Sequence, residues 1–176
     1  MNLDALLRVH RDFKDFSAEE RGELLGLLTE HTYADGAMLI REGEPGDAMY
    51  LIVEGQLLVT RRDVGGEPLR ICVMGTGELV GLVALIDPGP RTATCTVVGG
   101  ARVARLAAAD FERLFAADAP LAHRLQYLIA RQLASDLRLY NDALADTLTA
   151  PDDPQRFYDI IGTASIEYRV PRVARA

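Results

Sequence analysis

Cysteine and lysine are scarce in this chain of 176 residues. The two cysteines, Cys72 and Cys95, are too few for a framework of several disulfides, and both lie in apolar runs typical of strands. We expect them to be small buried hydrophobic residues. Lysine occurs only as Lys14, so almost all positive charge comes from arginine. We attribute this preference for arginine to the base composition of the genome and not to a recognition surface.

Long hydrophobic runs are also missing. No apolar stretch reaches the roughly 18 residues that suggest a membrane-spanning helix, and residues 1–10 lack the features of a secretory signal. Together with the two cysteines, this predicts a cytoplasmic protein without membrane contact. The net charge of −7 would repel the phosphate backbone of nucleic acids, which argues against general affinity for them.

Residue patterns of common enzymes are missing as well. His10, His31 and His123 are isolated, and no second histidine or cysteine stands one, three or four residues from any of them. Paired histidines, as in a metal-dependent jelly-roll enzyme, do not occur, nor does a nucleophile elbow, P-loop or dinucleotide fingerprint. We therefore expect no catalytic residues, no metal site and no enzyme.

What the chain does contain is a change of hydrophobic period along its length. Residues 1–30 have helical spacing, with a capping box predicted between Ser17 and Glu20. Residues 31–107 alternate short β-type runs with glycine turns, which predicts a mainly β fold, a double-stranded β-helix or jelly roll. The expected strands are Met38–Ile40, Met49–Val53, Gln56–Arg62, Pro68–Val73, Thr92–Val98 and Arg102–Leu106, with turns that include Glu54–Gly55 and Gly99–Gly100.

Helical spacing returns after residue 107. A short helix is expected at Asp110–Phe115, and a longer one from Pro120 to Leu148 that either crosses the barrel or pairs with a second copy as a homodimer. Its apolar face comprises Leu121, Leu125, Ile129, Leu133, Tyr140, Leu144 and Leu148. The expected domain spans 1–148, made of helices 1–30, β-roll 31–107 and helices 110–148, and a tail spans 149–176.

Two segments carry the information about function. Residues 42–56 read EGEPGDAMYLIVEGQ, with glycines that permit tight reversals, and residues 77–94 read GELVGLVALIDPGPRTAT. Both resemble the cyclic nucleotide-binding domain family, whose members include catabolite-activator-type regulators and protein kinase regulatory subunits. The first resembles the start of the family's β-roll, and the second its phosphate-binding cassette. The resemblance implies a β-roll that carries a phosphate-binding cassette and stands alone, without a DNA-binding domain.

The resemblance also implies roles for single residues. Arg91 would supply a charged, two-pronged donor to phosphate, and Gly81 would let the backbone approach the ligand. Amides after the glycine would bind the anion at a helix start. The implied ligand-binding residues are Gly81, Leu82, Val83, Ala84, Arg91 and Thr92, and, because the family's long helix often covers the base, also Arg131, Gln132 and Ser135. Cyclic AMP or cyclic GMP would be the ligand.

Leu82 departs from the family pattern, because a glutamate that accepts the ribose 2′-hydroxyl is expected there. A charge-assisted hydrogen bond contributes about 1.5–3 kcal/mol, so its loss would weaken binding about ten- to a hundredfold. Three hypotheses stay open. The chain is a sensor for a cyclic nucleotide or related anion, a degenerate β-roll that binds no nucleotide and acts in dimerisation or protein interaction, or a site for a non-ribose phosphate or acidic lipid.

The partners implied are a small anionic ligand, a second copy through the long helix and a further protein. Transcription regulators of the family carry a helix-turn-helix domain after that helix. Here 28 residues follow Leu148. We therefore expect no direct DNA binding.

Overall fold

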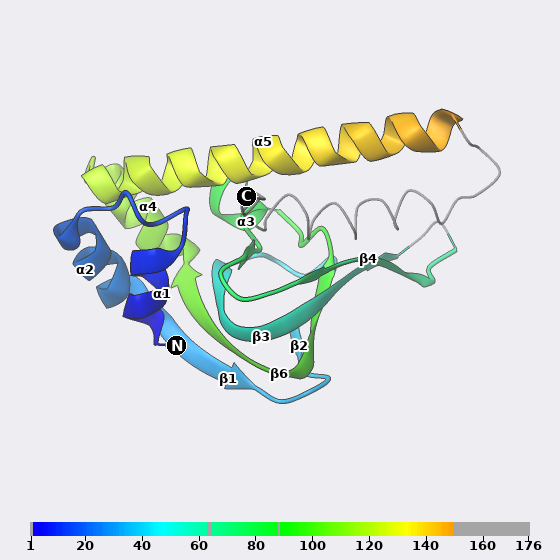
Figure 1. The fold of residues 1–176 in the computed structure, drawn as a ribbon, viewed down its shortest axis with the longest axis horizontal. Coiled ribbons are helices and arrows are strands. Elements are labelled where there is room, and N and C mark those ends of the chain that lie inside the picture. Colours follow the sequence, from blue (N-terminus) through cyan, green and yellow to red (C-terminus); the bar gives the residue numbers. More distant parts are fainter. Residues whose placement is uncertain (1, 63–64, 88, 150–176) are drawn as a thin grey trace, which may run out of the picture.

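The computed structural model describes residues 2–62, 65–87 and 89–149. A roll of antiparallel strands occupies the centre, two short helices cover one end, and a long helix crosses over the top (Figure 1). Almost all of the tail expected at 149–176 lies outside the described residues. Helices and strands keep the order that the hydrophobic periods predict, helix then β then helix.

The N-terminal helices are α1, Leu3–Val9, and α2, Ala18–Leu27. The predicted capping box is confirmed: the Ser17 hydroxyl accepts from the Glu20 amide at 3.1 Å, and the Glu20 carboxylate accepts from the Ser17 amide at 2.7 Å. These bonds satisfy amides that a helix start otherwise leaves unpaired. Helix α2 ends at Leu27, earlier than the sequence indicates.

All six strands pair antiparallel, in the order β1-β6-β3-β4, with β2 joined to β6 and β5 to β3. Their bounds are β1 Thr29–Tyr33, β2 Met38–Ile40, β3 Ala48–Arg62, β4 Pro68–Met74, β5 Leu79–Val80 and β6 Thr94–Ala107. The mainly β fold class with flanking helices is thus confirmed. Strands β1 and β5 were not predicted, because β1 is polar and β5 has only two residues.

The turns predicted at Glu54–Gly55 and Gly99–Gly100 are wrong. Both pairs lie inside continuous strands, β3 and β6, whose ladder passes through Gly55 opposite Ala101 with register shifts on either side. Gly55 has φ +95°, and a Cβ on it would lie 2.3 Å from the Gly100 carbonyl oxygen. The glycines therefore permit a sharp bend and a close approach of two paired strands, not a chain reversal.

Two hydrophobic clusters meet at the first half of β3. Ala48, Tyr50 and Ile52 belong to the roll core, inside the β-roll, whereas the alternate residues belong to the helix core, which includes α1, α2, α4 and α5. Side chains of a strand alternate between its faces, so burial on both sides explains the continuous apolar run there. The strand therefore ties the roll directly to the helices.

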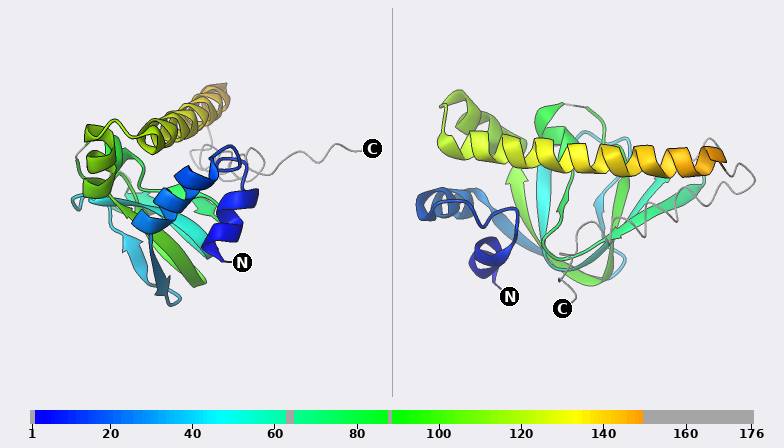
Figure 2. Two further views of the ribbon diagram at one scale, coloured as in Figure 1. Left: turned by 90° about the vertical axis from the view of Figure 1, so that its left-hand side faces the viewer. Right: turned by 45° about the horizontal axis from the view of Figure 1, so that its top comes forward.

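The remaining helices are α3, Val83–Ile86, α4, Ala108–Ala116, and α5, Pro120–Thr149. Leu121, Leu125 and Ile129 anchor the start of α5 and are fully buried in the helix core. The second half of α5 runs on over the side of the β-roll that carries α3 (Figure 2). Within the described ranges, no helix combines the length and apolar character needed to cross a membrane.

Candidate ligand-binding site

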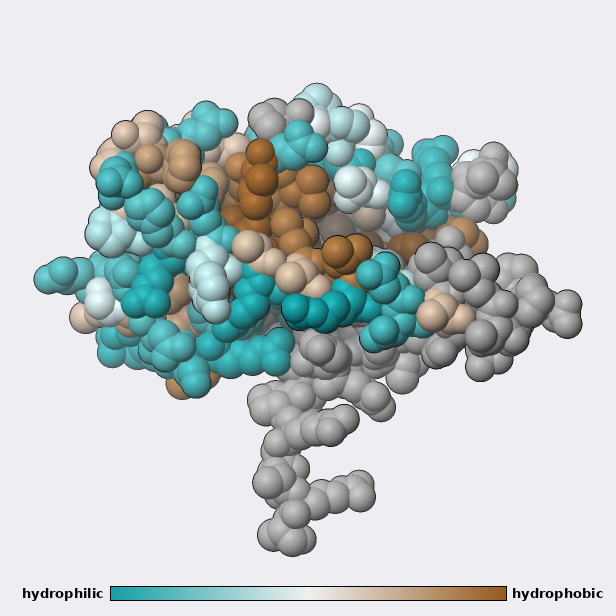
Figure 3. All heavy atoms as spheres, turned by 90° about the horizontal axis from the view of Figure 1, so that it is seen from above, coloured by the Kyte–Doolittle hydropathy of each residue, from teal (hydrophilic) through white to brown (hydrophobic). Residues whose placement is uncertain are grey.

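A cavity of about 180 Å³ lies between the β-roll, α3 and α5. It is on the face where hydrophobic residues gather in the centre, with hydrophilic ones around them (Figure 3). The cavity is lined by Ile40, Val59, Cys72, Met74, Leu79, Val80, Gly81, Leu82, Val83, Pro90, Arg91, Thr92, Ala93, Cys95, Leu133, Asp136 and Tyr140. Its walls are therefore mostly hydrocarbon and sulfur, with few polar groups.

Arg91 is held at this cavity by the two segments that the sequence singles out. Its amide donates to the Glu44 carbonyl at 2.8 Å, and the Gly43 amide donates to the Arg91 carbonyl at 2.9 Å. These bonds join residues 42–56 to the cassette, beside a bridge between Pro45 and Pro90. Arg91 is 8% exposed, the one buried polar or charged residue among those the structure describes.

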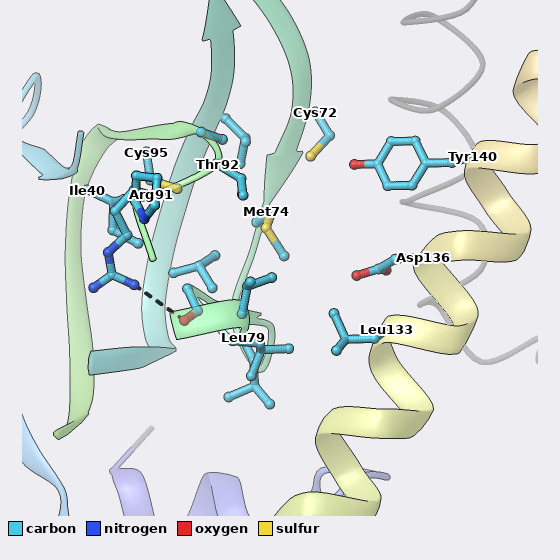
Figure 4. A pocket seen from close by; sticks show the side chains of 17 residues that line it. Ile40, Cys72, Met74, Leu79, Arg91, Thr92, Cys95, Leu133, Asp136 and Tyr140 are labelled. Atoms are coloured by element: carbon cyan, nitrogen blue, oxygen red, sulfur yellow. Dashed lines mark hydrogen bonds between the residues drawn. The ribbon is translucent and has the colours of Figure 1, made fainter. Parts of the chain in front are cut away.

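The guanidinium group of Arg91 lies beside Gly81, and Figure 4 draws the hydrogen bond between them as a dashed line. Its Nη1 donates to the Gly81 carbonyl oxygen at 3.3 Å. Gly81 has φ +77°, and a Cβ there would lie 2.7 Å from the same nitrogen. Only glycine adopts this backbone conformation without strain and also leaves room for the side chain.

Compensation of the Arg91 charge is partial. Its Nη2 lies 3.6 Å from Oδ1 of Asp47, a side chain that is 72% exposed and also accepts from Arg105 Nη2 at 2.8 Å. A buried cation is costly unless it is paired and hydrogen-bonded, and a guanidinium has five N–H donors. The site therefore retains capacity for an anion.

The other predicted cassette residues line the cavity wherever their side chains are described, and one of them also packs in the helix core. Val83 and Thr92 line the cavity, as do Gly81 and Arg91. Leu82 lines it too, but at 5% exposure it also belongs to the helix core. Ala84 lies in α3, and its side chain is outside the described part of the structure. The structure thus brings together every cassette residue whose side chain it describes.

Arg131, Gln132 and Ser135 lie on another side of α5, away from this cavity. All three line a separate groove of about 420 Å³ beside residues 11–15, where Arg131 forms an ion pair with Asp12. Gln132 donates to Asp136 at 3.0 Å. The geometry therefore does not support a role for these three residues in ligand binding, because other residues of α5 lie beside the cavity.

Among the α5 side chains that the structure describes, Leu133, Asp136 and Tyr140 face the cavity (Figure 4). Sequence reasoning selected polar residues from the middle of the helix and missed these. The signal was present, because Leu133 stands four residues after the anchored Ile129 and Tyr140 seven further on, at helical spacing. The buried start of the helix therefore determines which side meets the cavity.

Both cysteines face the cavity, from the two strands that flank β3. Cys72 on β4 and Cys95 on β6 each pair with Val59 of β3, so one residue separates them across the sheet, and both are buried and outside any disulfide, as expected. Burial, together with Cys72, raises the pKa of the Cys95 thiol to about 12. The Cys95 thiol is therefore an unreactive, apolar part of the wall.

The sequence of this chain is similar to those of known proteins. The model of the cyclic nucleotide-binding domain matches residues 30–118. The CRP-like cAMP-activated global transcriptional regulator of Mycobacterium tuberculosis is 34% identical over 113 residues, 64% of this chain and 49% of that protein. The chain spans about half the length of this curated relative.

Solved structures show the same fold. A cyclic nucleotide-binding domain from Methylobacillus flagellatus KT superposes with a TM-score of 0.73 at 26% identity, over 81% of each chain. The regulatory domain of Toxoplasma gondii PKA, in a co-crystal with cAMP, superposes with a TM-score of 0.62 at 29% identity, over 73% of this chain and 48% of that one. The chain belongs to the cyclic nucleotide-binding domain family.

Proposed function

We propose that this chain is a regulatory sensor that binds a cyclic nucleotide, cyclic AMP or cyclic GMP, or a related small anion at Arg91. The observation that carries this proposal is a buried, partly compensated guanidinium held beside Gly81 at the cavity. Relatives whose names include cAMP support an anionic ligand of this class. Those relatives are regulators, and we propose no catalytic role.

Signalling would pass through α5. Leu133, Asp136 and Tyr140 face the cavity, so a ligand there contacts the same helix that is anchored in the helix core. A ligand shifts an equilibrium only if it binds one arrangement better than the other. Direct contact between the occupant and α5 provides that difference in affinity.

The output would be a contact with a second copy along the outer face of α5. Tyr127, Ala130, Ala134, Leu137 and Asn141 follow a three-four spacing, the seam of a coiled coil. Tyr127 is 68% and Leu137 61% exposed. A polar Asn at one seam position favours a single register. We infer a homodimer through this seam.

A β-roll without a nucleotide, acting only in dimerisation or protein interaction, is the second candidate. Leu82 favours it, because this side chain fills the expected ribose position with hydrocarbon and packs in the helix core. In either case the reducing cytoplasm suits a protein whose two buried cysteines form no disulfide. The domain bounds, 1–148 with a tail from 149, stay a prediction.

Calorimetric titration with cyclic AMP and cyclic GMP tests the sensor. Wild type should bind at least one of them below millimolar concentration, and Arg91→Ala should lose that binding. Arg113→Ala is the matched control, because it removes an exposed arginine on α4 whose partner is the nearby Asp110. Arg91→Lys, which keeps the charge but not the fork, guards against a folding defect in Arg91→Ala.

If Arg91→Ala binds as wild type does, the anion is not at Arg91. No binding of any anion by folded wild-type protein would favour the interaction module.

A further inference from the structure

The wall beside Arg91 is the feature that the proposed function leaves unexplained. On the α3 side, Leu79, Leu82 and Val83 present hydrocarbon to the cavity. On the roll side, Ile40, Val59, Cys72, Met74 and Cys95 do the same. A hydroxyl buried against such a wall loses its bonds to water and finds no partner there. The wall therefore disfavours a sugar.

The few polar groups lie at two opposite ends. Arg91 and its neighbour Thr92 lie at one end, whereas Asp136 and Tyr140 approach from α5 at the other (Figure 4). Asp136 would repel a second negative charge placed at the far end of a ligand. An occupant with one anionic head and an uncharged body fits this arrangement best.

The size of the cavity points the same way. Its volume is about 180 Å³. An apolar cavity of about 150 Å³ in another protein takes up benzene. The pocket opens to solvent on one side, and its sheltered part corresponds to one ring or a short chain beside Leu133.

We infer that the preferred ligand of this site is an amphipathic anion, a single carboxylate or phosphate head on a short apolar acyl or aryl body. The inference rests on the proposed function, since it keeps the anion at Arg91. The head binds the Arg91 guanidinium, and the body lies between Leu82 and Leu133. Leu82 is then a specificity-determining residue that replaces a sugar contact with an apolar one.

Calorimetry on the 176-residue chain tests this with hexanoate, octanoate, octyl phosphate, 1-octanol and cyclic AMP. Octanoate or octyl phosphate should bind at least tenfold more tightly than 1-octanol, because only the anions use Arg91. Each added methylene should strengthen binding about fourfold. The heat capacity change on binding should be negative, as burial of apolar surface requires. Whichever head binds better identifies carboxylate or phosphate as the source.

Two variants locate the body of the ligand. Leu133→Gln should weaken octanoate binding at least tenfold, whereas Phe115→Gln, at an exposed apolar position on α4, should leave it unchanged. Leu82→Glu should weaken the binding of octanoate. The same variant should bind cyclic AMP more tightly than 2′-deoxy cyclic AMP. The last comparison isolates the ribose hydroxyl.

The possible failures are distinguishable. Arg91-dependent binding of cyclic AMP that exceeds every alkyl anion tenfold would overturn this inference and leave the sensor intact. Equal binding of octanoate and 1-octanol, unaffected by Arg91→Ala, would mean unspecific apolar uptake and would also overturn it. Absence of any Arg91-dependent binding would remove the proposed sensor itself.

Discussion

Arg91 Nη1 donates a hydrogen bond to the carbonyl oxygen of Gly81, and the two residues lie ten positions apart on either side of α3. The bond closes the cassette on itself, so the helix between them is held at both ends. The position of the Arg91 charge therefore depends on the backbone of Gly81, a residue without a side chain.

Gly81→Ala should disrupt this closure. The new Cβ would lie 2.7 Å from Arg91 Nη1 and 3.1 Å from the Ala48 carbonyl oxygen, at a φ of +77°. We expect a loss of about 1–2 kcal/mol from the backbone conformation alone, and at least a tenfold loss of anion affinity. Urea unfolding and calorimetry measure the two effects.

Gly36→Ala separates the effect of backbone strain at a positive φ from the effect of a Cβ that collides with Arg91. Gly36 has a similar φ of +74°, but nothing lies within 4 Å of its hypothetical Cβ. This variant should lose similar stability and keep its anion affinity. Equal loss of affinity in both variants would contradict the role assigned to Gly81.

Asp47→Asn should strengthen anion binding. The Asp47 carboxylate lies between Arg91 and Arg105, at 3.6 Å and 2.8 Å, and competes with a ligand for the Arg91 charge. Because Asp47 is exposed, we expect a gain of only about two- to tenfold, decreasing with salt. Titration at two ionic strengths measures it. Glu44→Gln, which neutralises an exposed acid in the same loop, is the control.

A weaker anion complex in Asp47→Asn would show instead that this carboxylate positions the guanidinium. In that case the salt dependence should not change.

His10 should make stability depend on pH. Burial lowers the pKa of His10 below 6.5, although Asp12 opposes the shift. Protons therefore bind the unfolded chain more readily, and stability that is present above pH 6.5 is lost as the pH falls through 6.5 towards the lowered value. Arg11, Glu78 and Arg131 also act on this group.

Urea unfolding at pH 7.5 and 5.5 measures the effect of His10. Wild type should lose more stability between these values than His10→Gln. Equal losses in wild type and His10→Gln would assign the pH dependence to other groups.

Leu137→Asp should produce a monomer if the outer face of α5 is the dimer seam. Burial of two unpaired carboxylates at such a seam is unfavourable. Light scattering gives the mass, and Phe115→Asp, at an exposed position on α4, should leave it unchanged. A persistent dimer would exclude this face. Deletion of α5 is a poorer test, because Leu121, Leu125 and Ile129 are part of the helix core.

The sequence predicted the cassette better than the strands around it. The Gly81 to Arg91 spacing depends on local backbone demands, whereas the bonds between residues 42–56 and the cassette are visible only in the structure. Gly55 and Gly100 misled, because a positive φ suits a turn and a bend within a strand equally well. Only the pairing of β3 with β6 distinguishes the two.

Helix α5 shows a second limit. Its apolar face continues from Leu121 in the helix core to Leu133, which packs against that core and lines the cavity, and to Tyr140 at the cavity. The side chains of Leu144 and Leu148 lie outside the described part of the structure. The choice of Arg131, Gln132 and Ser135 required the rotation of the helix about its axis, which depends on tertiary packing and not on local spacing.

The anchored start of α5 has a mechanical consequence. Ile129 is held without exposed surface, and Tyr140 lies eleven residues further on, about 16 Å along the axis. A tilt of about 10° at that pivot would displace Tyr140 by about 3 Å. In the proposed sensor, the helix would therefore serve as a lever, with the largest displacement at the end far from Ile129.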